Sequence, residues 1–200
     1  MFVQVIEGRT NDPEALHRQL EIWQRDLMPG AIGYLGSTGG CTSDGDCILV
    51  ARFETAAAAR KNSERPEQGA WWAETEKCFS GPVTFHDTSD VDVMMHRPMN
   101  DAQFVQVMEG HVTDRARAME LEREADPLLA TIRPDLLGTI TAYFDDREFA
   151  SVAYFRSEAE ARQAERQALS DEMMASMAEW DRVMKVERYL DIADPWLVKA

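Results

Sequence analysis

Apolar and polar residues alternate in two different ways near the start of the chain. Residues 2–7 are β-branched or aromatic at most positions, which predicts a β-strand. Further along, large apolar residues recur every three or four positions, at Leu16, Leu20, Trp23 and Leu27. This spacing places them on one side of a helix, with Asp12 as its N-cap and Pro13 as its first residue. We therefore expect a strand followed by a helix that ends at residues 29–30.

The residues that follow predict two more strands, a second helical region and a final strand. The sequence SDGD at residues 43–46 is typical of a hairpin turn, because Asp-Gly accepts positive φ angles. It separates residues 32–38 and 47–54, which we expect to be paired strands. A helical region interrupted by a proline then runs over residues 55–79, and residues 83–86 form the last strand. The order β-α-β-β-α-β is that of a ferredoxin-like unit.

The first strand occurs a second time about halfway along the chain. Residues 2–8 (FVQVIEG) recur as residues 104–110 (FVQVMEG), a spacing of 102 positions. The same spacing relates residues 51–54 to residues 153–156. The second half predicts the same element order, with a strand at 103–109, a helix at 114–130, strands at 136–143 and 148–155, a helix at 157–180 and a strand at 183–190. Such internal similarity indicates a duplicated structural unit.

The duplication predicts the fold class and the domain organisation. We expect an α+β protein with two fused ferredoxin-like repeats, residues 1–95 and 102–200, joined by a linker at residues 96–101. Residues 48–51 form a continuous apolar run, as in strands that are buried on both faces. The simplest cover for the second face is the sheet of the other repeat, so the two sheets are predicted to face each other in an α+β barrel. The fused chain supplies both sheets and is expected to be a monomer or a homodimer.

Charge and cysteine content limit the function further. The chain has 21 Lys and Arg against 36 Asp and Glu, a net charge of −15. This balance argues against nucleic acid and anionic membranes as partners. No apolar run is long enough to span a membrane, and no two histidines have a metal-ligand spacing, so we expect no metal. Cys41 and Cys47 flank the hairpin turn and could lie close together. With Cys78 the count is odd, however, and we expect reduced thiols in a cytoplasmic protein.

Gln4 and Gln106 are polar residues in the middle of apolar strands, at equivalent positions of the two repeats. A buried amide needs hydrogen-bond partners. One interpretation is a structural hydrogen bond across the barrel, which the presence of the glutamine in both repeats favours. The other interpretation is an amide that orients a ligand in a pocket.

The element order and its duplication resemble the dimeric α+β barrel superfamily over nearly the whole chain. That group includes the antibiotic biosynthesis monooxygenase-like proteins, the heme-degrading monooxygenases and stress-responsive proteins of unassigned activity. The resemblance implies a small-molecule pocket between the sheet and the helices of one unit. It also implies either cofactor-free oxidation of aromatic polyketides or cleavage of heme. Heme-degrading members carry a histidine ligand late on the second helix, whereas residues 79–82 read FSGP here, so we expect no heme and no other cofactor.

The resemblance also implies which residues would form the pocket. Members of both oxygenase types use an amide near the substrate and a tryptophan on the second helix, which makes Asn62, Trp71 and Trp72 candidates. We expect one tryptophan in the core and the other on the pocket wall, with core packing of both as the alternative. His86 on the last strand could act as an acid or base, because free histidine has a pKa near 6.5, or could be structural. The expected catalytic residues are His86 and Asn62, and the expected ligand-binding residues are Gln4, Arg65, Trp71 and Trp72.

The second repeat has Met173 and Met174 where the first has its two tryptophans, so we expect the site in the first half and scaffold in the second. The glutamate-rich runs at residues 120–124 and 158–160 are expected to be solvated helix faces. The expected function is small-molecule binding, as a cofactor-independent monooxygenase acting on an apolar aromatic substrate. The alternative is a non-catalytic binding or stress-associated protein with a filled barrel. A cavity of roughly a few hundred Å³ favours the first reading and a filled interior favours the second.

Overall fold

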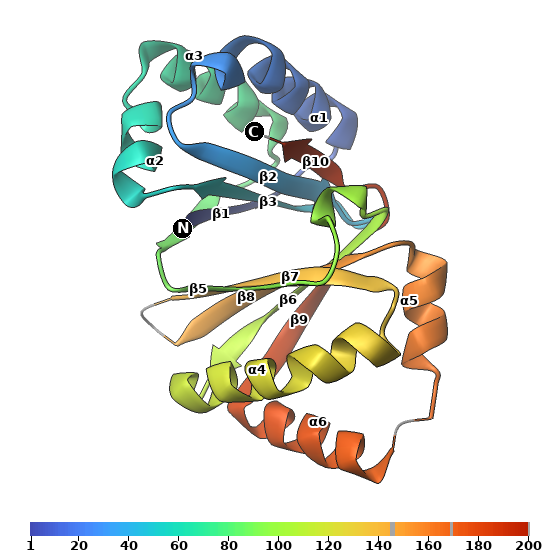
Figure 1. Ribbon diagram of the computed structural model, residues 1–200. Helices are drawn as coiled ribbons and strands as arrows, with labels where there is room; N and C mark the ends of the chain where they lie inside the picture. The colour runs from blue at the N-terminus through green and yellow to red at the C-terminus, as the bar shows by residue number, and fades with distance from the viewer. Residues whose placement is uncertain (145–146, 169, 200) are drawn as a thin grey trace. The chain divides into compact units, whose positions relative to one another are not determined.

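The computed structural model of the protein describes residues 1–144, 147–168 and 170–199, which form two compact units. Unit 1 comprises Met1–Val91 and the C-terminal residues from Asp194, and unit 2 comprises Asp92–Ala193. In the described part of the chain, each unit has a five-stranded antiparallel sheet with helices on one face (Figure 1). The predicted α+β class with two ferredoxin-like repeats is confirmed. The facing of the two sheets stays a prediction.

Unit 1 has the elements that the apolar pattern predicts. They are β1 (Phe2–Arg9), α1 (Pro13–Ile22), β2 (Tyr34–Cys41), β3 (Asp46–Phe53), α2 (Ala56–Ser63), α3 (Pro66–Thr75) and β4 (Thr84–Thr88). Helix α1 begins as expected, because the Asp12 carboxylate accepts a hydrogen bond of 2.9 Å from the Ala15 amide. The chain then continues through a π-helical turn, Trp23–Leu27, and a 3-10 turn that ends at Gly30.

Unit 2 repeats this order, with one difference from the helices that the sequence predicted. Its elements are β5 (Val91–Met95), β6 (Phe104–Val112), α4 (Arg115–Ile132), β7 (Leu136–Tyr143), β8 (Glu148–Phe155), α5 (Glu158–Glu165), α6 (Asp171–Val183) and β9 (Met184–Ile192); β10 (Trp196–Lys199) follows. Strands β7 and β8 have the predicted bounds. The single helix expected at residues 157–180 is two separate helices, α5 and α6, like α2 and α3 of unit 1.

The pattern did not predict the strands β5 and β10, which we call the exchanged strands. The strand order is β10-β2-β3-β1-β4 in unit 1 and β5-β7-β8-β6-β9 in unit 2. Strand β5 follows β4 in the chain but pairs with β7 of the second sheet, whereas β10 follows β9 and pairs with β2 of the first. The units therefore differ from the predicted repeats at both exchanged strands, and the segment expected to be a linker, residues 96–101, belongs to unit 2.

A glycine at the same position of each repeat allows an exchanged strand to approach. Gly36 has φ +122°, and a Cβ on it would lie 2.7 Å from the Val198 carbonyl oxygen of β10. A Cβ on Gly138 would overlap the Met94 carbonyl oxygen of β5. Both glycines follow a register shift, in β2 and β7 respectively. The two exchanged strands therefore pair with their sheets at equivalent positions. Val198 of β10 occupies the position of Met94 of β5, and Trp196 that of Asp92.

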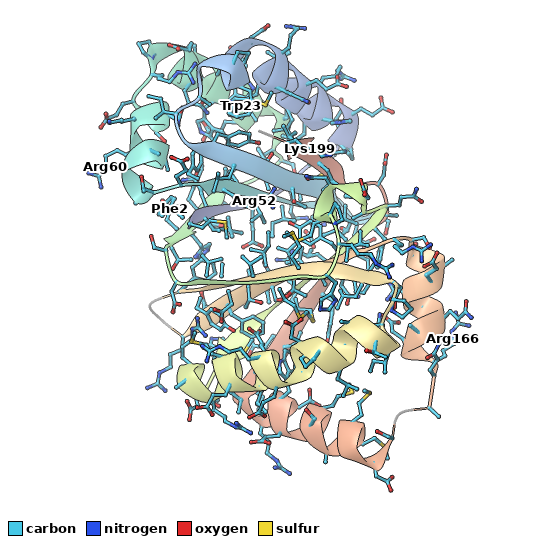
Figure 2. The ribbon with its side chains drawn as sticks, in the orientation of Figure 1. Phe2, Trp23, Arg52, Arg60, Arg166 and Lys199 are labelled. Atoms are coloured by element: carbon cyan, nitrogen blue, oxygen red, sulfur yellow. A yellow bond between two sulfur atoms is a disulfide. The ribbon has the colours of Figure 1, made fainter. Side chains whose placement is uncertain are left out.

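The helix-facing side of the first sheet carries a core of mostly aromatic residues. Phe2, Trp23, Tyr34, Phe53 and Trp71 belong to one buried cluster, and Figure 2 labels Phe2 and Trp23. All four members of the predicted α1 stripe are buried, which confirms the helical period. The opposite face of the sheet is buried as well, at Val3, Val5 and Val50. The expectation of strands buried on both faces is therefore confirmed in unit 1.

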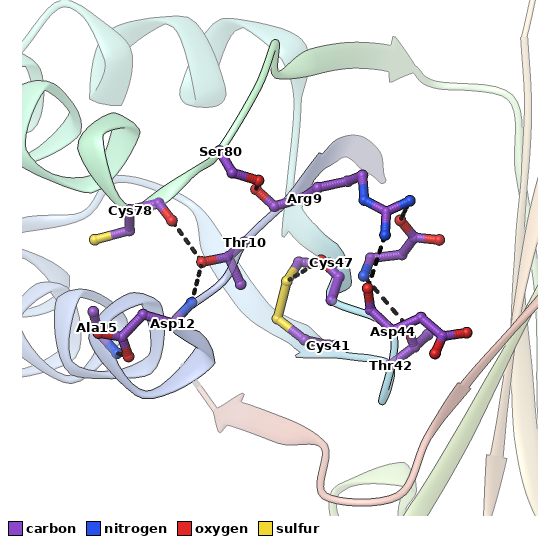
Figure 3. The surroundings of a disulfide bond; sticks show 12 residues. Arg9, Thr10, Asp12, Ala15, Cys41, Thr42, Asp44, Cys47, Cys78 and Ser80 are labelled. Atoms are coloured by element: carbon purple, nitrogen blue, oxygen red, sulfur yellow. Dashed lines mark hydrogen bonds and ion pairs between the residues drawn. A yellow bond between two sulfur atoms is a disulfide. The ribbon is translucent and has the colours of Figure 1, made fainter.

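The cysteines contradict the expectation of reduced thiols. Cys41 and Cys47 are opposite each other at the end of the β2–β3 hairpin, with a Cα–Cα distance of 4.1 Å, and form a disulfide (Figure 3). Cys78 has a free thiol, and Figure 3 shows its sulfur pointing away from the disulfide. The odd count was misleading because a hairpin register brings two cysteines together irrespective of a third. The prediction of a cytoplasmic location loses the support that reduced thiols gave it.

No helix among the described residues is long and apolar enough to cross a membrane.

Candidate functional site

A small cavity lies on the helix side of the first sheet, where the resemblance places a pocket. Strands β1 and β3, helices α1 and α3 and the exchanged strand β10 supply its walls, which include Leu20, Leu49, Trp71, Trp72 and Trp196. Its volume is about 20 Å³. A single water molecule needs about 10–15 Å³ on this measure, so the cavity has no room for an aromatic ring in this conformation. The lining is almost wholly apolar and offers no acid or base.

The two predicted tryptophans both lie on this cavity wall. Trp71 is buried, and its indole Nε1 donates a hydrogen bond of 2.7 Å to the Gln19 carbonyl oxygen of α1. Trp72 is half-buried, and its ring meets Phe85 of β4 edge-on at 5.2 Å between centroids. The wall is completed by Trp196, which stacks on His17 at 4.8 Å. Trp71 is thus a core residue that also lines the cavity, and Trp72 is the more exposed of the two.

Asn62 is engaged in the packing of its own helix and loop. Asn62 is only 3 % exposed to solvent. The amide nitrogen donates to the carbonyl oxygens of Ile32 and Ala58, at 2.8 and 2.9 Å, and the amide oxygen accepts from the Ile32 amide at 3.0 Å. These bonds use the whole amide to hold the chain before β2 on α2. The catalytic role predicted for Asn62 has no support from this geometry.

Arg65 likewise stabilises the end of the first helical segment. Its guanidinium donates to the Leu27 carbonyl oxygen at 3.2 Å from both terminal nitrogens, and it pairs with Glu67 at 2.8 Å. A cation is favourable there because the last carbonyl groups of a helix carry partial negative charge. Ligand binding by Arg65 stays a prediction, but the side chain is committed to these contacts and does not line the cavity.

Gln4 and Gln106 are half-buried rather than buried as expected. Gln4 donates to Asp87 of the adjacent strand β4 at 3.0 Å, and Gln106 donates to Asp191 of β9 at 2.8 Å. Each pair occupies directly opposite positions of its sheet. The structural hydrogen bond is therefore present twice, but it joins neighbouring strands of one sheet and does not cross a barrel.

His86 lies on the other face of the first sheet from the tryptophans. It pairs with Val5, whereas its neighbour Phe85 pairs with Ile6 of the cavity wall. Because successive side chains of a strand point to opposite faces, His86 shares the face of Val5. The structure thus does not bring His86 together with Trp71 and Trp72. Its catalytic role stays a prediction without a place in this cavity.

Unit 2 has a polar cluster on the helix side of its sheet, which the sequence reasoning missed. Glu122 of α4 accepts hydrogen bonds from the Tyr143 hydroxyl at 3.2 Å and, more weakly, from the Thr141 hydroxyl at 3.5 Å. Thr141 in turn shares a hydrogen bond of 2.9 Å with Ser151 of β8. The expectation that residues 120–124 form a solvated face is therefore wrong for Glu122, which points inward.

The environment of Glu122 disfavours its charged form. Burial raises its pKa to about 7, and the nearby Asp92 carboxylate contributes to the rise. The Tyr143 and Thr141 hydroxyls and the Arg115 guanidinium oppose the rise. Burial also raises the pKa of Tyr143, and the Glu122 carboxylate adds to this effect. A carboxyl group with a pKa near neutrality can both accept and release a proton under ordinary conditions.

The polar cluster occupies the positions that line the cavity in unit 1. Asp12 and Asp114 both cap their helices, so the spacing of 102 places Glu122 on the position of Leu20. The paired residues Thr141 and Ser151 replace Gly39 and Leu49 in the same register. The exchanged strand contributes Asp92 in unit 2 and Trp196 in unit 1, as derived above. Aligning the two helices from their caps would have shown a glutamate inside the apolar stripe, and this is the signal that could have revealed the cluster.

No group of three or more His, Cys, Asp or Glu residues in the described ranges is arranged to hold a metal ion.

Comparison with known proteins gives a likeness of fold over the whole chain. No protein-family model and no curated protein matches the sequence. A solved structure from Lactobacillus acidophilus, named as a candidate monooxygenase, matches with a TM-score of 0.74 at 14 % identity, over 99 % of this chain and 96 % of that one. The protein therefore has the tandem monooxygenase-like fold.

Two further solved structures share the tandem monooxygenase-like fold. One is a candidate monooxygenase from Fusobacterium nucleatum, with a TM-score of 0.73, 10 % identity and coverage of 99 % of this chain and 94 % of that one. The other is an anthrone oxidase-like protein, with a TM-score of 0.70, 10 % identity and coverage of 100 % and 91 %. These likenesses confirm the predicted resemblance to monooxygenase-like α+β proteins at the level of the fold, which by itself does not assign an activity.

Proposed function

We propose that the protein binds a small apolar aromatic molecule and oxidises it with molecular oxygen, without a metal, flavin or other cofactor. The observation that carries this proposal is the aromatic wall on the helix side of unit 1, where Trp71, Trp72 and Trp196 surround one small cavity. Tryptophan rings bury large apolar areas and favour stacked or edge-on contacts with other rings. The fold is shared with two proteins named as candidate monooxygenases and one named anthrone oxidase-like, which supports the choice of chemistry.

Binding requires the cavity to widen, because about 20 Å³ does not accept a ring. Trp72 and Phe79 are the wall residues best placed to move. Trp72 is half-buried and touches Phe79 and Phe85 through ring contacts of 6.4 and 5.2 Å. Phe79 follows the 3-10 turn that ends α3 and is also only partly buried. A ligand ring that displaces these side chains would rest on Trp71, whose indole is held by Gln19.

Anthrone is the test substrate, since one protein of this fold is named anthrone oxidase-like. Its oxidation consumes one O₂: the C10 methylene loses two hydrogens, one oxygen atom forms the new carbonyl and the other leaves as water. The substrate supplies all the electrons, so no external reductant is needed. We expect the protein to accelerate the conversion of anthrone to anthraquinone, followed by absorbance and by oxygen uptake.

The matched variants are Trp72→Ala in unit 1 and Trp180→Ala in unit 2. Trp72→Ala removes the contact between the indole ring and the bound anthrone, which we expect to contribute about 1.4 kcal/mol to binding. The KM for anthrone should therefore rise about tenfold. Trp180 lies outside the cavity, so Trp180→Ala is expected to leave KM unchanged. A wild-type rate equal to that of buffer would refute the proposed activity, and equal KM values in the two variants would refute the location.

The small volume of the cavity favours a second candidate function, a non-catalytic protein whose first unit is filled by its own side chains. In that case native mass spectrometry of the freshly purified protein shows the bare chain mass, and anthrone is not oxidised. An added mass that disappears on denaturation would instead identify a bound ligand and exclude a first unit that is filled by its own side chains.

A further inference from the structure

The polar cluster of unit 2 lies along a seam between helix α4 and the exchanged strand β5. At one end Arg115 pairs with Asp92 at 3.2 Å, and its guanidinium lies 3.4 Å above the centre of the Tyr143 ring. At the other end His96, just after β5, meets Asp126 of α4 with 2.6 Å between Nε2 and Oδ1. Glu122 is one helical turn before Asp126 and so faces the seam between these two pairs.

The seam contains both a proton acceptor and donors for a developing anion. Glu122 is half-buried and is the proton acceptor. The Tyr143 hydroxyl is a hydrogen-bond donor beside it, and Arg115 provides a positive charge above the same ring. Among the described residues, the Nδ1 atom of His96 is the one buried side-chain nitrogen or oxygen without a hydrogen-bond partner. A buried polar atom of this kind calls for a ligand or a water as its missing partner.

The packing of α4 on the sheet does not require the polar groups of this cluster. In unit 1 the equivalent positions hold Leu20, Gly39, Leu49 and Trp196, and the same sheet and helices pack through apolar contacts. Burying a carboxyl group between a helix and a sheet costs free energy unless it is paired, and here its hydrogen bonds come from neutral hydroxyls. Two copies of one unit have thus diverged at the same place, one toward an apolar wall and one toward acid–base groups.

We propose that the seam between α4 and β5 of unit 2 is an acid–base site in which the Glu122 carboxylate removes a proton from a small aromatic carbon acid or phenol. In an anthrone, the C10–H bond breaks, the proton passes to a Glu122 oxygen and the electron pair moves through the ring to the carbonyl oxygen. The Tyr143 hydroxyl and the Arg115 guanidinium stabilise that oxyanion. This step needs no oxidant, and it rests on the proposed function only for the choice of anthrone as substrate.

The test measures proton removal without oxygen. Under anaerobic conditions in D₂O, proton NMR follows the replacement of the C10 hydrogens of anthrone by deuterium. We expect the wild-type protein to accelerate the exchange over buffer, with a rate that rises with pH through a midpoint near 7. Glu122→Gln keeps the shape of the side chain and removes the base, so the acceleration should fall about 10²–10⁴-fold. Glu124→Gln, on the exposed side of the same helix, should leave it unchanged.

A second variant keeps the proposal testable if Glu122→Gln does not fold. Tyr143→Phe retains the ring below Arg115 and removes a hydrogen bond that lowers the pKa of Glu122. The exchange rate should fall and its pH midpoint should rise, a combination that a purely structural role would not produce. No acceleration by the wild type, or equal rates in wild type and Glu122→Gln, would overturn the proposal. Exchange without oxidation in air would refute the oxidase function and leave the acid–base site standing.

Discussion

Replacing Trp71 with alanine is expected to lower the free energy of unfolding by about 3–5 kcal/mol, the usual cost of removing a large buried aromatic side chain. Trp71 joins α3 to α1 through the bond from its indole to Gln19, and its ring lies within the aromatic core of unit 1, 6.4 Å from that of Trp23. The substitution leaves a void on the helix side of the sheet and removes the side-chain hydrogen bond that joins α3 to the Gln19 carbonyl oxygen.

Urea denaturation followed by circular dichroism measures this loss, with Trp72→Ala as the control. Trp72 is half-buried and donates no hydrogen bond among those described, so its removal should cost about 1–2 kcal/mol. The assignment of Trp71 to the core and Trp72 to the movable wall fails if the two variants are equally stable, or if Trp72→Ala is the less stable.

Removing β10, by ending the chain at Asp194, is expected to destabilise unit 1 by about 3–5 kcal/mol, although the deleted residues follow unit 2 in the sequence. Val198 is buried in the core of unit 1, and Trp196 stacks on His17 of α1. The deletion also leaves β2 as an unpaired edge strand, which favours aggregation.

Tryptophan fluorescence can report this effect separately for unit 1. Four of the five tryptophans are in unit 1, so a Trp180→Phe background removes the signal from unit 2. The exposed Lys199→Ala substitution on the same strand serves as the control and should change the urea midpoint little. If the shortened chain unfolds at the same urea concentration as the control, β10 does not stabilise unit 1 and the strand exchange is contradicted.

The main elements of the fold could be predicted because local pattern and tertiary structure agree there. Strands β7 and β8 have their predicted bounds, and the apolar stripe that runs through α1 and the following π-helical turn is buried along its length. The exchanged strands could not be predicted in this way. Strand β10 is four residues long and pairs with a strand more than 150 residues earlier, so no local periodicity marks it.

The residues around the cavity were predictable only in part. Trp71 and Trp72 both line the cavity, whereas the sequence predicted one of them in the core and the other on the wall. Their role in ligand binding stays a prediction. Asn62 and Arg65 have side chains suited to catalysis, but backbone carbonyl groups nearby take up their hydrogen bonds. Glu122 was missed because it lies between Glu120 and Glu124 in a run of ionisable residues. Such a run is typical of a solvated helix face, and the sequence pattern does not distinguish the one residue that points inward.

The raised pKa of Glu122 also predicts how stability depends on pH. Between about pH 4.5 and 7 the folded protein keeps a proton on Glu122 that the unfolded chain has released, so this group makes folding less favourable as pH rises. Glu122→Gln removes the effect. The stability of the variant relative to wild type should therefore increase by about 3 kcal/mol from pH 4.5 to pH 7.5, since each pKa unit corresponds to about 1.4 kcal/mol.

Carbon-13 NMR of the Glu122 side-chain carboxyl group, titrated in the folded protein and assigned with Glu122→Gln, tests the central claim most directly. If unit 2 has diverged from unit 1 to hold an acid–base group, the carboxyl signal of Glu122 titrates with a midpoint near 7, well above the ordinary range of a glutamate. A midpoint for Glu122 close to that of an exposed glutamate, about 4.3, would show a solvated carboxylate and contradict the account.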